Sequence, residues 1–321
     1  MNQNRVSTRY TFLKILTGSD LSRRRLPLMV IESKEPGPIV WLTACIHGDE
    51  VGGQLVIQEV FKLLKSRLIR GAVYAFPLMN PIGFENSTRT ITFSREDLNR
   101  SFPGNPNGSL GERMAYLIFQ KIKDTQPQLL LDLHNDWRQS VPYVLLDKAS
   151  QAISGEAYNQ ARLLGQKSGF YLVEDTDEIH NSLSHCLLQH AIPAITYELG
   201  ESSLVNEKTT AFGASSVINL LAQLKMVDSN TPQFDYPLHP SYRSDQILRY
   251  SDKPYCTKSG IIRFIVKPGT SVRSGQALAK IFNAFGKLQE NLVAETDAII
   301  LGTADSAVAF PGMSPTVSGI V

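Results

Sequence analysis

Short apolar segments alternate with amphipathic segments along the first two thirds of the chain. Apolar runs bounded by polar or turn-forming residues predict strands at 26–31, 39–45, 72–78, 128–134, 141–146 and 192–198. Apolar residues at helical spacing predict helices at 51–65, 109–124, 152–168, 182–190 and 210–224. The 109–124 helix begins with Ser109 and Glu112, which have the spacing of a capping box. The alternation predicts an α/β domain over residues 1–227, with a largely buried sheet.

The pattern changes after residue 227. Residues 228–249 include a stretch rich in Pro, Asp, Ser and Asn, which is typical of a linker. Residues 250–321 contain short β-patterned runs separated by Gly and Pro, and they predict a small all-β domain. Glu295-Thr296-Asp297 resembles the hairpin of lipoyl and biotinyl carrier domains, which have a barrel-sandwich fold. Ala298 stands where a carrier needs a lysine, so we interpret this domain as a structural lid or an assembly surface.

One irregular segment, residues 79–108, separates two predicted elements of the α/β domain. It has no convincing period and is rich in Asn, Pro, Gly and Arg. Long structureless segments inside compact domains are uncommon and are usually functional. We therefore expect this loop to contribute to a binding or catalytic site.

Composition narrows the class of protein. Of the 321 residues, 42% are hydrophobic and 19% are charged, which is typical of a soluble globular chain. The net charge of +2 and the short run Arg23-Arg24-Arg25 give no support to nucleic-acid binding. No signal peptide or membrane span is predicted, and three widely spaced cysteines suggest reduced thiols, so we expect a cytoplasmic protein. The sequence is compatible with a homo-oligomer.

Three of the predicted strands end on a residue that can bind a metal or transfer a proton. His47 and Glu50 follow the 39–45 strand, His134 ends the 128–134 strand, and Glu198 ends the 192–198 strand. In an open α/β sheet, ligands bind beyond the carboxyl ends of the strands. His47, Glu50 and His134 would supply the two imidazoles and one carboxylate of a catalytic zinc site. Glu198 would then accept a proton from water activated by the metal.

The irregular loop carries candidate substrate-binding residues. Asn99 and Arg100 place an amide beside a guanidinium group, a pair well matched to a carboxylate. Arg89 lies earlier in the same loop. Solvent exposure is the ordinary role of a loop arginine, but a nearby metal site favours binding of an anionic substrate.

These motifs together resemble the succinylglutamate desuccinylase/aspartoacylase family, a branch of the zinc carboxypeptidase-like fold. The matching segments are His47-Gly48-Asp49-Glu50, Asp97-Leu98-Asn99-Arg100 with Phe102-Pro103-Gly104, Asp132-Leu133-His134, and Glu198-Leu199-Gly200. The resemblance implies a mixed sheet flanked by helices, followed by a C-terminal β domain. It also implies one Zn²⁺ per chain and a zinc-dependent amidohydrolase that deacylates a small, anionic N-acyl amino acid.

The same resemblance implies a role for each candidate residue. His47, Glu50 and His134 would hold the zinc, and Glu198 would act as general base and then as general acid. Arg100 would hold the substrate carboxylate or polarise the scissile carbonyl, with Asn99 beside it and Arg89 as a further substrate-binding residue. Asp97 would orient a ligand histidine, expected to be His47, through a hydrogen bond.

Two other functions remain open at this stage. A metallocarboxypeptidase that removes the C-terminal residue of a short peptide would use the same zinc ligands and the same Asn-Arg pair. A binding or scaffold protein that kept a zinc-enzyme fold without catalysis would be expected to lack a ligand or the base, and the sequence lacks neither. The other histidines, His180, His185, His190 and His239, follow no ligand spacing, so we interpret them as surface residues or as core residues with satisfied hydrogen bonds.

Overall fold

The computed structural model of the chain describes residues 6–17, 21, 23–228, 234, 236–243 and 245–321. Its strands are β1 (Val6–Thr17), β2 (Arg23–Ser33), β3 (Ile39–Ala44), β4 (Ala72–Phe76), β5 (Leu129–Asp136), β6 (Gln139–Ser140), β7 (Tyr143–Leu146), β8 (Tyr171–Glu174), β9 (Ala194–Glu201), β10 (Leu248–Ser251), β11 (Gly260–Phe264), β12 (Ser271–Val272), β13 (Ala277–Phe282), β14 (Leu288–Val293), β15 (Ala298–Thr303), β16 (Val308–Ala309) and β17 (Thr316–Ile320). The larger sheet is 13-stranded, in the order β1-β2-β4-β3-β5-β9-β7-β8-β10-β17-β15-β12, and β6 pairs with β15. The second sheet is 4-stranded, in the order β14-β13-β11-β16.

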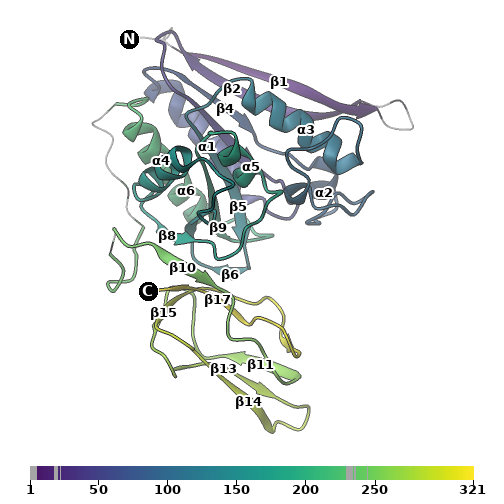
Figure 1. Cartoon of the computed structure of the whole chain (residues 1–321), viewed down its shortest axis with the longest axis vertical. Coiled ribbons are helices and arrows are strands. Elements are labelled where there is room, and N and C mark those ends of the chain that lie inside the picture. Colours follow the sequence, from purple (N-terminus) through teal and green to yellow (C-terminus); the bar gives the residue numbers. More distant parts are fainter. Residues whose placement is uncertain (1–5, 18–20, 22, 229–233, 235, 244) are drawn as a thin grey trace.

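Helices cover the part of the larger sheet formed by the first two thirds of the chain (Figure 1). They are α1 (Gly52–Arg67), α2 (Pro81–Glu85), α3 (Leu110–Lys123), α4 (Gly155–Gly165), α5 (Leu183–Gln189) and α6 (Glu207–Gln223), with a short 3₁₀ turn, η1 (Leu98–Arg100). α1 packs against α6 and against β3 and β5, while α5 contacts β5 and β9. Ser109 and Glu112 form the predicted capping box at the start of α3.

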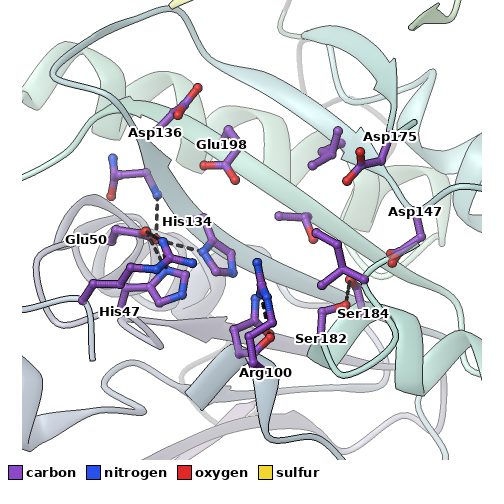
Figure 2. Close-up of a pocket in the computed structure, with 16 residues that line it drawn as sticks. His47, Glu50, Arg100, His134, Asp136, Asp147, Asp175, Ser182, Ser184 and Glu198 are labelled. Carbon is purple, nitrogen blue, oxygen red and sulfur yellow. Dashed lines mark hydrogen bonds and ion pairs between the residues drawn. The ribbon is translucent and has the colours of Figure 1, made fainter. Parts of the chain in front are cut away.

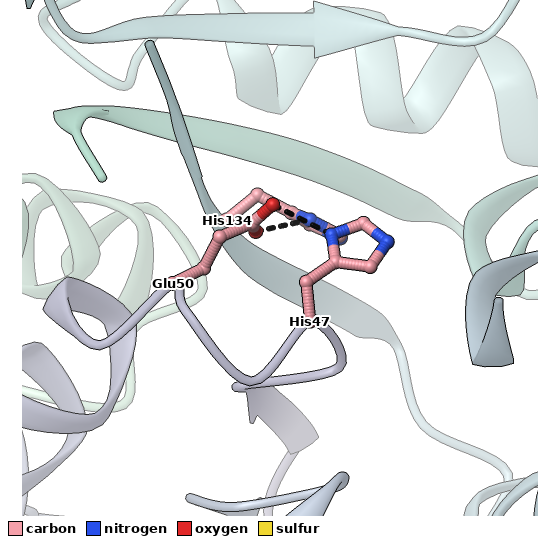
Figure 3. Close-up of side chains that lie close together, drawn as sticks. All are labelled: His47, Glu50 and His134. Carbon is pink, nitrogen blue, oxygen red and sulfur yellow. Dashed lines mark hydrogen bonds and ion pairs between the residues drawn. The ribbon is translucent and has the colours of Figure 1, made fainter. Parts of the chain in front are cut away.

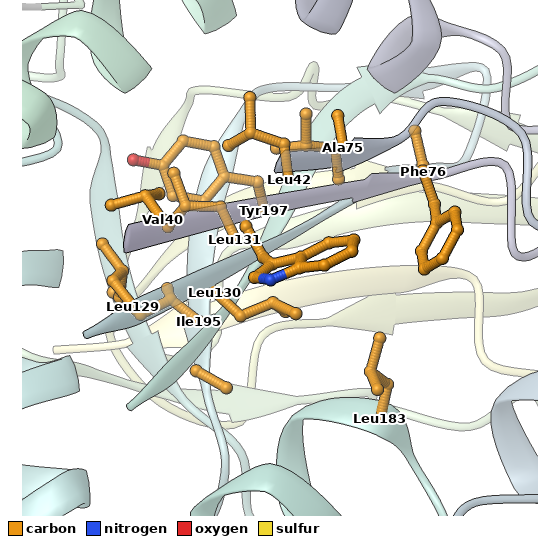
Figure 4. Packing of buried hydrophobic residues seen from close by; sticks show 14 of the residues in the cluster. Val40, Leu42, Ala75, Phe76, Leu129, Leu130, Leu131, Leu183, Ile195 and Tyr197 are labelled. Atoms are coloured by element: carbon orange, nitrogen blue, oxygen red, sulfur yellow. The ribbon is translucent and has the colours of Figure 1, made fainter. Parts of the chain in front are cut away.

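The centre of the larger sheet is formed by β3, β5 and β9, which run parallel. Residues 129–135 of β5 are all buried, as expected for a strand covered on both faces. Trp41 on β3 is fully buried and stacks on Tyr74 at 5.2 Å between ring centroids. Figure 4 shows apolar side chains from these neighbouring strands packed together at the centre of the core. A core of this kind holds the carboxyl ends of the central strands in fixed register.

The sequence predicted most of these elements correctly, and the mixed α/β fold is confirmed. The predicted helices at 152–168 and 210–224 are observed at Gly155–Gly165 and Glu207–Gln223. β1 and β8 were not predicted. β1 is an edge strand whose residues 6–16 are exposed or half-buried, so it has no clear apolar face. β8 is short and mostly buried, and a run of that kind has no period that marks it as a strand.

The C-terminal strands extend the larger sheet. β10 begins at Leu248, inside the expected linker, and pairs with β8 on one side and with β17 on the other. Side chains from β7, β8, β10, β15 and β17 share one hydrophobic cluster. Residues 229–233, 235 and 244 of the expected linker lie outside the described residues. The division into residues 1–227, 228–249 and 250–321 stays a prediction.

Two further observations bear on the expected location. The three cysteines are free and buried. Among the helices that the structure describes, none is long and apolar enough to cross a membrane. A cytoplasmic location itself stays a prediction.

The loop between β3 and α1 is held close to the irregular segment of the chain. The Gly48 N–H donates to the carbonyl of Thr88 at 2.9 Å. A Cβ atom on Gly48 would lie 2.0 Å from the carbonyl carbon of Gly83 and 2.2 Å from the amide nitrogen of Phe84. Both contacts are with the backbone at α2, which cannot rotate away as a side chain could. Glycine at position 48 therefore permits the close approach that fixes this loop.

We predict that Gly48→Ala destabilises the protein and disturbs the loop that carries His47. The overpacked backbone should lower the free energy of unfolding by about 1–3 kcal/mol. Gly155→Ala is the matched control, because a Cβ atom there meets nothing within 4 Å. Urea denaturation of the two variants and the parent would measure the difference. Equal free energies of unfolding for the two variants would contradict the prediction, because the backbone would then accommodate a Cβ atom at position 48 without loss of stability.

Candidate metal centre and substrate cavity

His47, Glu50 and His134 converge on one point at the carboxyl ends of β3 and β5. Their ligand atoms lie within 4.8 Å of one another, and all three residues are buried. His47 Nδ1 lies 2.6 Å from Glu50 Oε1, and His134 Nδ1 lies 2.8 Å from Glu50 Oε2. Figure 3 shows dashed lines from the Glu50 carboxylate to both rings. The structure thus brings together the three residues that the sequence singled out.

Strand register brings the fourth residue to the same place. His134 on β5 pairs with Glu198 on β9, and Tyr143 on β7 pairs with Glu198 from the other side. Side chains of paired residues lie on the same face of a sheet. Glu198 therefore faces the cavity beside His134, as the strand-end argument predicted.

Each histidine also contacts a second carboxylate through its other ring nitrogen. His47 Nε2 lies 3.3 Å from Asp97 Oδ1, and His134 Nε2 lies 3.0 Å from Asp132 Oδ2. Such pairs fix the ring orientation and the tautomer of metal-binding histidines and raise their basicity. Two imidazoles and a carboxylate, each imidazole held in this way, fit the donor set of a catalytic zinc.

The charges of the three residues depend on one another. Burial alone would favour the neutral form of Glu50, but the neighbouring His47 and His134 outweigh it and lower the pKa of the Glu50 carboxyl. Burial likewise opposes protonation of His134, but Asp132 and Glu50 raise its pKa well above the usual range. The cluster therefore favours an ionised Glu50 carboxylate beside a protonated His134 ring, and a bound metal ion would supply the positive charge instead.

Glu198 has an environment different from that of Glu50. Burial raises its pKa well above the usual range, and the nearby Asp136 and Glu50 add to this against the opposing effect of His134. Its Oε2 atom is buried and has no hydrogen-bond partner among the described residues. A carboxyl group in that state is suited to exchange a proton with a bound molecule.

The four residues line one cavity of about 160 Å³. Figure 2 shows His47, Glu50 and His134 on one side of it, Arg100 beside them, and Asp147 and Asp175 away from them. The described residues that line it are His47, Glu50, Arg89, Asn99, Arg100, His134, Asn135, Asp136, Leu145, Asp147, Asp175, Ile179, Ser182, Ser184, Thr196 and Glu198. No described residue of 250–321 is among them, so the expectation that the C-terminal part forms a lid gains no support from this cavity.

The three candidate substrate-binding residues all line the cavity, but they differ in how their side chains are hydrogen-bonded within the protein. Arg89 donates to Asp97 Oδ2 from Nε at 3.1 Å and from Nη2 at 3.0 Å, while its Nη1 lies 3.8 Å from Glu50 Oε1. Arg100 is exposed and donates from Nη1 to the backbone carbonyl of Asn99 at 2.8 Å. The Asn99 amide oxygen accepts the N–H of Leu183 at 2.9 Å, so that oxygen holds α5 in place.

The sequence argument gave no role to several residues that line the cavity or contact its histidines. Asp132 and Asp136 flank His134 at alternate positions of β5, and this alternation on one face could have identified them. Asp147 and Asp175 directly follow the neighbouring parallel strands β7 and β8. The argument from strand ends applied to them as well, but β8 was not recognised as a strand.

The other histidines lie outside this cluster. His180 and His190 are exposed, and His239 is half-buried. His185 differs from our interpretation, because it is buried and neither ring nitrogen has a hydrogen-bond partner among the described residues. Burial lowers its pKa, which favours the neutral ring.

The chain is similar to known proteins in sequence and in fold. The family described as succinylglutamate desuccinylase/aspartoacylase catalytic domain matches residues 36–224. An N-alpha-acetyl-L-2,4-diaminobutyric acid deacetylase from Halomonas elongata is 26% identical over 287 residues, covering 85% of this chain and 79% of that protein. The product-bound ectoine utilization protein EutE (DoeB) from Ruegeria pomeroyi superposes with a TM-score of 0.84 at 20% identity, covering 100% of this chain and 98% of the other. A metallo-carboxypeptidase from Burkholderia cenocepacia shares the fold at a TM-score of 0.56 and 14% identity, over 70% of this chain and 65% of its own.

We predict that Asp147→Asn stabilises the protein at neutral pH but not at pH 4. Burial raises the pKa of Asp147 to about 7, whereas the unfolded chain titrates near 3.8. Between these values the folded state holds one proton more, so stability falls as the pH rises. The amide avoids this loss, and the gain at pH 7 should be roughly 1–3 kcal/mol. Denaturant titrations of both proteins at pH 4 and pH 7 would measure it, and a gain equal at the two pH values would contradict the assignment.

Proposed function

Because the chain belongs to the succinylglutamate desuccinylase/aspartoacylase family, we propose that it is a zinc-dependent amidohydrolase that deacylates a small N-acyl amino acid. The observation that carries the proposal is the convergence of His47, Glu50 and His134, with Glu198 facing them in the same cavity. The Halomonas relative deacetylates an N-acetyl amino acid by its name, so acetyl is the first acyl group to test.

His47, Glu50 and His134 would hold the zinc, and Asp97 and Asp132 would keep the two imidazoles in place. The bound ion supplies Lewis acidity, which makes water a stronger nucleophile and polarises a carbonyl group. The chain's own residues would then perform the proton transfers. Glu198 takes a proton from the attacking water and returns it to the leaving amine nitrogen, so the carboxylate is regenerated in each turnover.

Two guanidinium groups can assist this reaction. Arg89 lies beside Glu50, so it is placed to stabilise negative charge that develops on the acyl oxygen. Arg100 is exposed at the cavity wall, and its guanidinium group suits the α-carboxylate of the substrate. With these roles Arg89 acts near the reacting atoms, and Arg100 mainly orients the substrate.

Cavity size favours a small amide over a peptide. Sites that enclose drug-sized ligands typically have volumes of roughly 300–1,000 Å³. The cavity here is about 160 Å³. The metallocarboxypeptidase alternative shares the fold but needs room for a peptide, so assaying a blocked dipeptide beside N-acetyl and N-succinyl amino acids separates the two activities.

We predict that Glu198→Gln keeps the metal but loses most of its turnover. The amide is nearly isosteric but cannot accept a proton, and general-base catalysis contributes typically 10²–10⁴-fold. Glu201→Gln is the matched control, because Glu201 is on the same strand and is not among the residues lining the cavity. Zinc content by elemental analysis and kcat on an N-acetyl amino acid would be measured together. A Glu198→Gln enzyme that turns over at the parent rate would remove Glu198 from the mechanism.

We predict that removing the metal abolishes activity and that added zinc restores it. Dialysis against a chelator should leave apoprotein with fewer bound ions than one per chain, and His134→Ala should fail to rebind zinc because one of three ligands is lost. His190→Ala is the control, since His190 lies outside the cluster. Metal stoichiometry and activity, measured before and after zinc addition, provide the test. Full activity in metal-free protein would contradict the proposed function.

A further inference from the structure

The cavity has an acidic wall away from the proposed reaction centre, formed by Asp147 and Asp175. Asp147 directly follows β7 and Asp175 directly follows β8. The Asp175 N–H donates to the Leu146 carbonyl at 2.9 Å, which fixes the two strand ends side by side. Both side chains line the same cavity as His134 and Glu198. None of the roles assigned above to the reaction uses this acidic wall.

The sheet defines a path from the reaction centre to these aspartates. Glu198 and Thr196 lie on one face of β9, and Leu145 of β7 pairs with Thr196. Asp147 is two residues beyond Leu145 and therefore continues the same face. All four residues line the cavity. A bound molecule whose amide lies at Glu198 would extend along this face in the direction of Asp147 (Figure 2).

Burial raises the pKa of the carboxyl groups of Asp147 and Asp175, and a bound ammonium group would favour their ionised forms. The Asp147 side chain is 9% exposed, and the Nδ1 atom of His185 lies 3.7 Å from Asp147 Oδ1. That ring favours the neutral form because burial lowers its pKa. Ser184 hydrogen-bonds the Asp147 carboxylate but carries no charge. One oxygen of Asp175 accepts the N–H of Asp177 at 3.2 Å. Arg100 opposes the rise in the pKa of Asp175, but no ion pair joins either aspartate to an arginine among the described residues.

The lining of the whole cavity contains more acidic groups than guanidinium groups. Its described lining contains five carboxyl groups, from Glu50, Asp136, Asp147, Asp175 and Glu198, and two guanidinium groups, from Arg89 and Arg100. A bound zinc would offset the carboxylates near Glu50. It would not face Asp147 and Asp175, which lie away from the proposed ligands (Figure 2). A substrate with an anionic side chain would be repelled there, whereas a substrate with an ammonium group would be attracted.

We propose that Asp147 and Asp175 select N-acyl amino acids whose side chain ends in an amine, with Asp147 as the main contact and Asp175 in support. This inference rests on the proposed function, and it specifies the substrate class of the same cavity. Arg100 would hold the α-carboxylate, Glu198 would face the scissile amide, and the side-chain ammonium group would lie against the acidic wall. The relative from Halomonas elongata has a diamino acid in its name, which is consistent with this arrangement.

Three N-acetyl amino acids test the proposal with the zinc-loaded protein, and the diamino and norvaline derivatives among them have equal numbers of non-hydrogen atoms. Nα-acetyl-L-2,4-diaminobutyrate carries an ammonium group, N-acetyl-L-norvaline a methyl group, and N-acetyl-L-glutamate a carboxylate at the end of the side chain. A hydrogen bond to a charged partner at a buried position corresponds to a preference of roughly ten- to hundredfold in kcat/KM. We expect the diamino substrate to exceed norvaline by that factor, and glutamate to be the poorest of the three.

Variants then assign the preference to the two aspartates. Asp147→Asn should reduce the ratio of kcat/KM between the diamino and norvaline substrates by roughly tenfold or more, and Asp175→Asn should reduce it less. Asp124→Asn is the control, because Asp124 is exposed and is not among the residues lining the cavity. That variant should keep the parent ratio. Asp175→Asn gives an independent measurement of the same ratio.

Failure of the inference can be told from failure of the proposed function. If the parent hydrolyses norvaline or glutamate derivatives as well as the diamino derivative, or if Asp147→Asn slows all substrates equally, the cation-selective wall is wrong and the amidohydrolase stands. If no N-acyl amino acid is hydrolysed, the proposed function fails. Calorimetry with free L-2,4-diaminobutyrate and L-norvaline gives a second readout that needs no turnover. Stronger binding of the diamino acid, lost in Asp147→Asn, is the expected result, and equal binding would overturn the inference.

Discussion

The approach of two imidazoles to the single carboxylate of Glu50 is the constraint on which the rest of this structure depends. Each ring turns its Nδ1 atom toward one oxygen of that carboxylate, at 2.6 and 2.8 Å. Buried ionisable groups so close together are tolerated only when each is paired, because burial of an unpaired charge is costly. The contacts of Asp97 and Asp132 complete the pairing. These contacts form only if the loop after β3, the central strands and the irregular segment 79–108 are positioned precisely relative to one another.

The fold meets this requirement by combining a rigid part with a closely packed loop. His134 and Glu198 are on β5 and β9, the buried strands at the centre of the sheet, so their separation is set by strand register. His47 and Glu50 are in a loop, but that loop is fixed by the Gly48–Thr88 hydrogen bond and by contact of Gly48 with the backbone of α2. Side chains on strands are held in precise positions, whereas side chains on the loop can point in directions that a strand does not allow.

The cavity separates chemistry from selectivity in space. The residues proposed to hold zinc and to transfer protons gather at one end, where β3, β5 and β9 finish. The aspartates proposed to recognise the side chain follow β7 and β8, of which β7 runs antiparallel to β9. Because the direction of the sheet reverses at that point, strand ends of opposite direction line a single cavity. Substitutions on β7 and β8 could thus change the preferred substrate without moving the metal ligands.

The sequence by itself determined the order of most strands and helices, the α/β class, and the residues of the proposed metal centre. It could do so because buried strands and amphipathic helices have distinct periods, and because a polar residue at the end of an apolar strand is unusual. It also identified Asp97 through a family resemblance, and the contact of Asp97 with His47 is observed.

Only the tertiary structure decided which faces and edges meet. The pairing of Asp132 with His134 depends on side-chain direction within β5, and the meeting of Asp147 with Asp175 depends on the pairing of β7 with β8. The extension of the main sheet by β10, β17, β15 and β12 likewise depends on contacts between segments far apart in the chain. A local sequence pattern does not predict which strands will pair, because hydrogen bonds between strands are made by the backbone and are nearly independent of residue type.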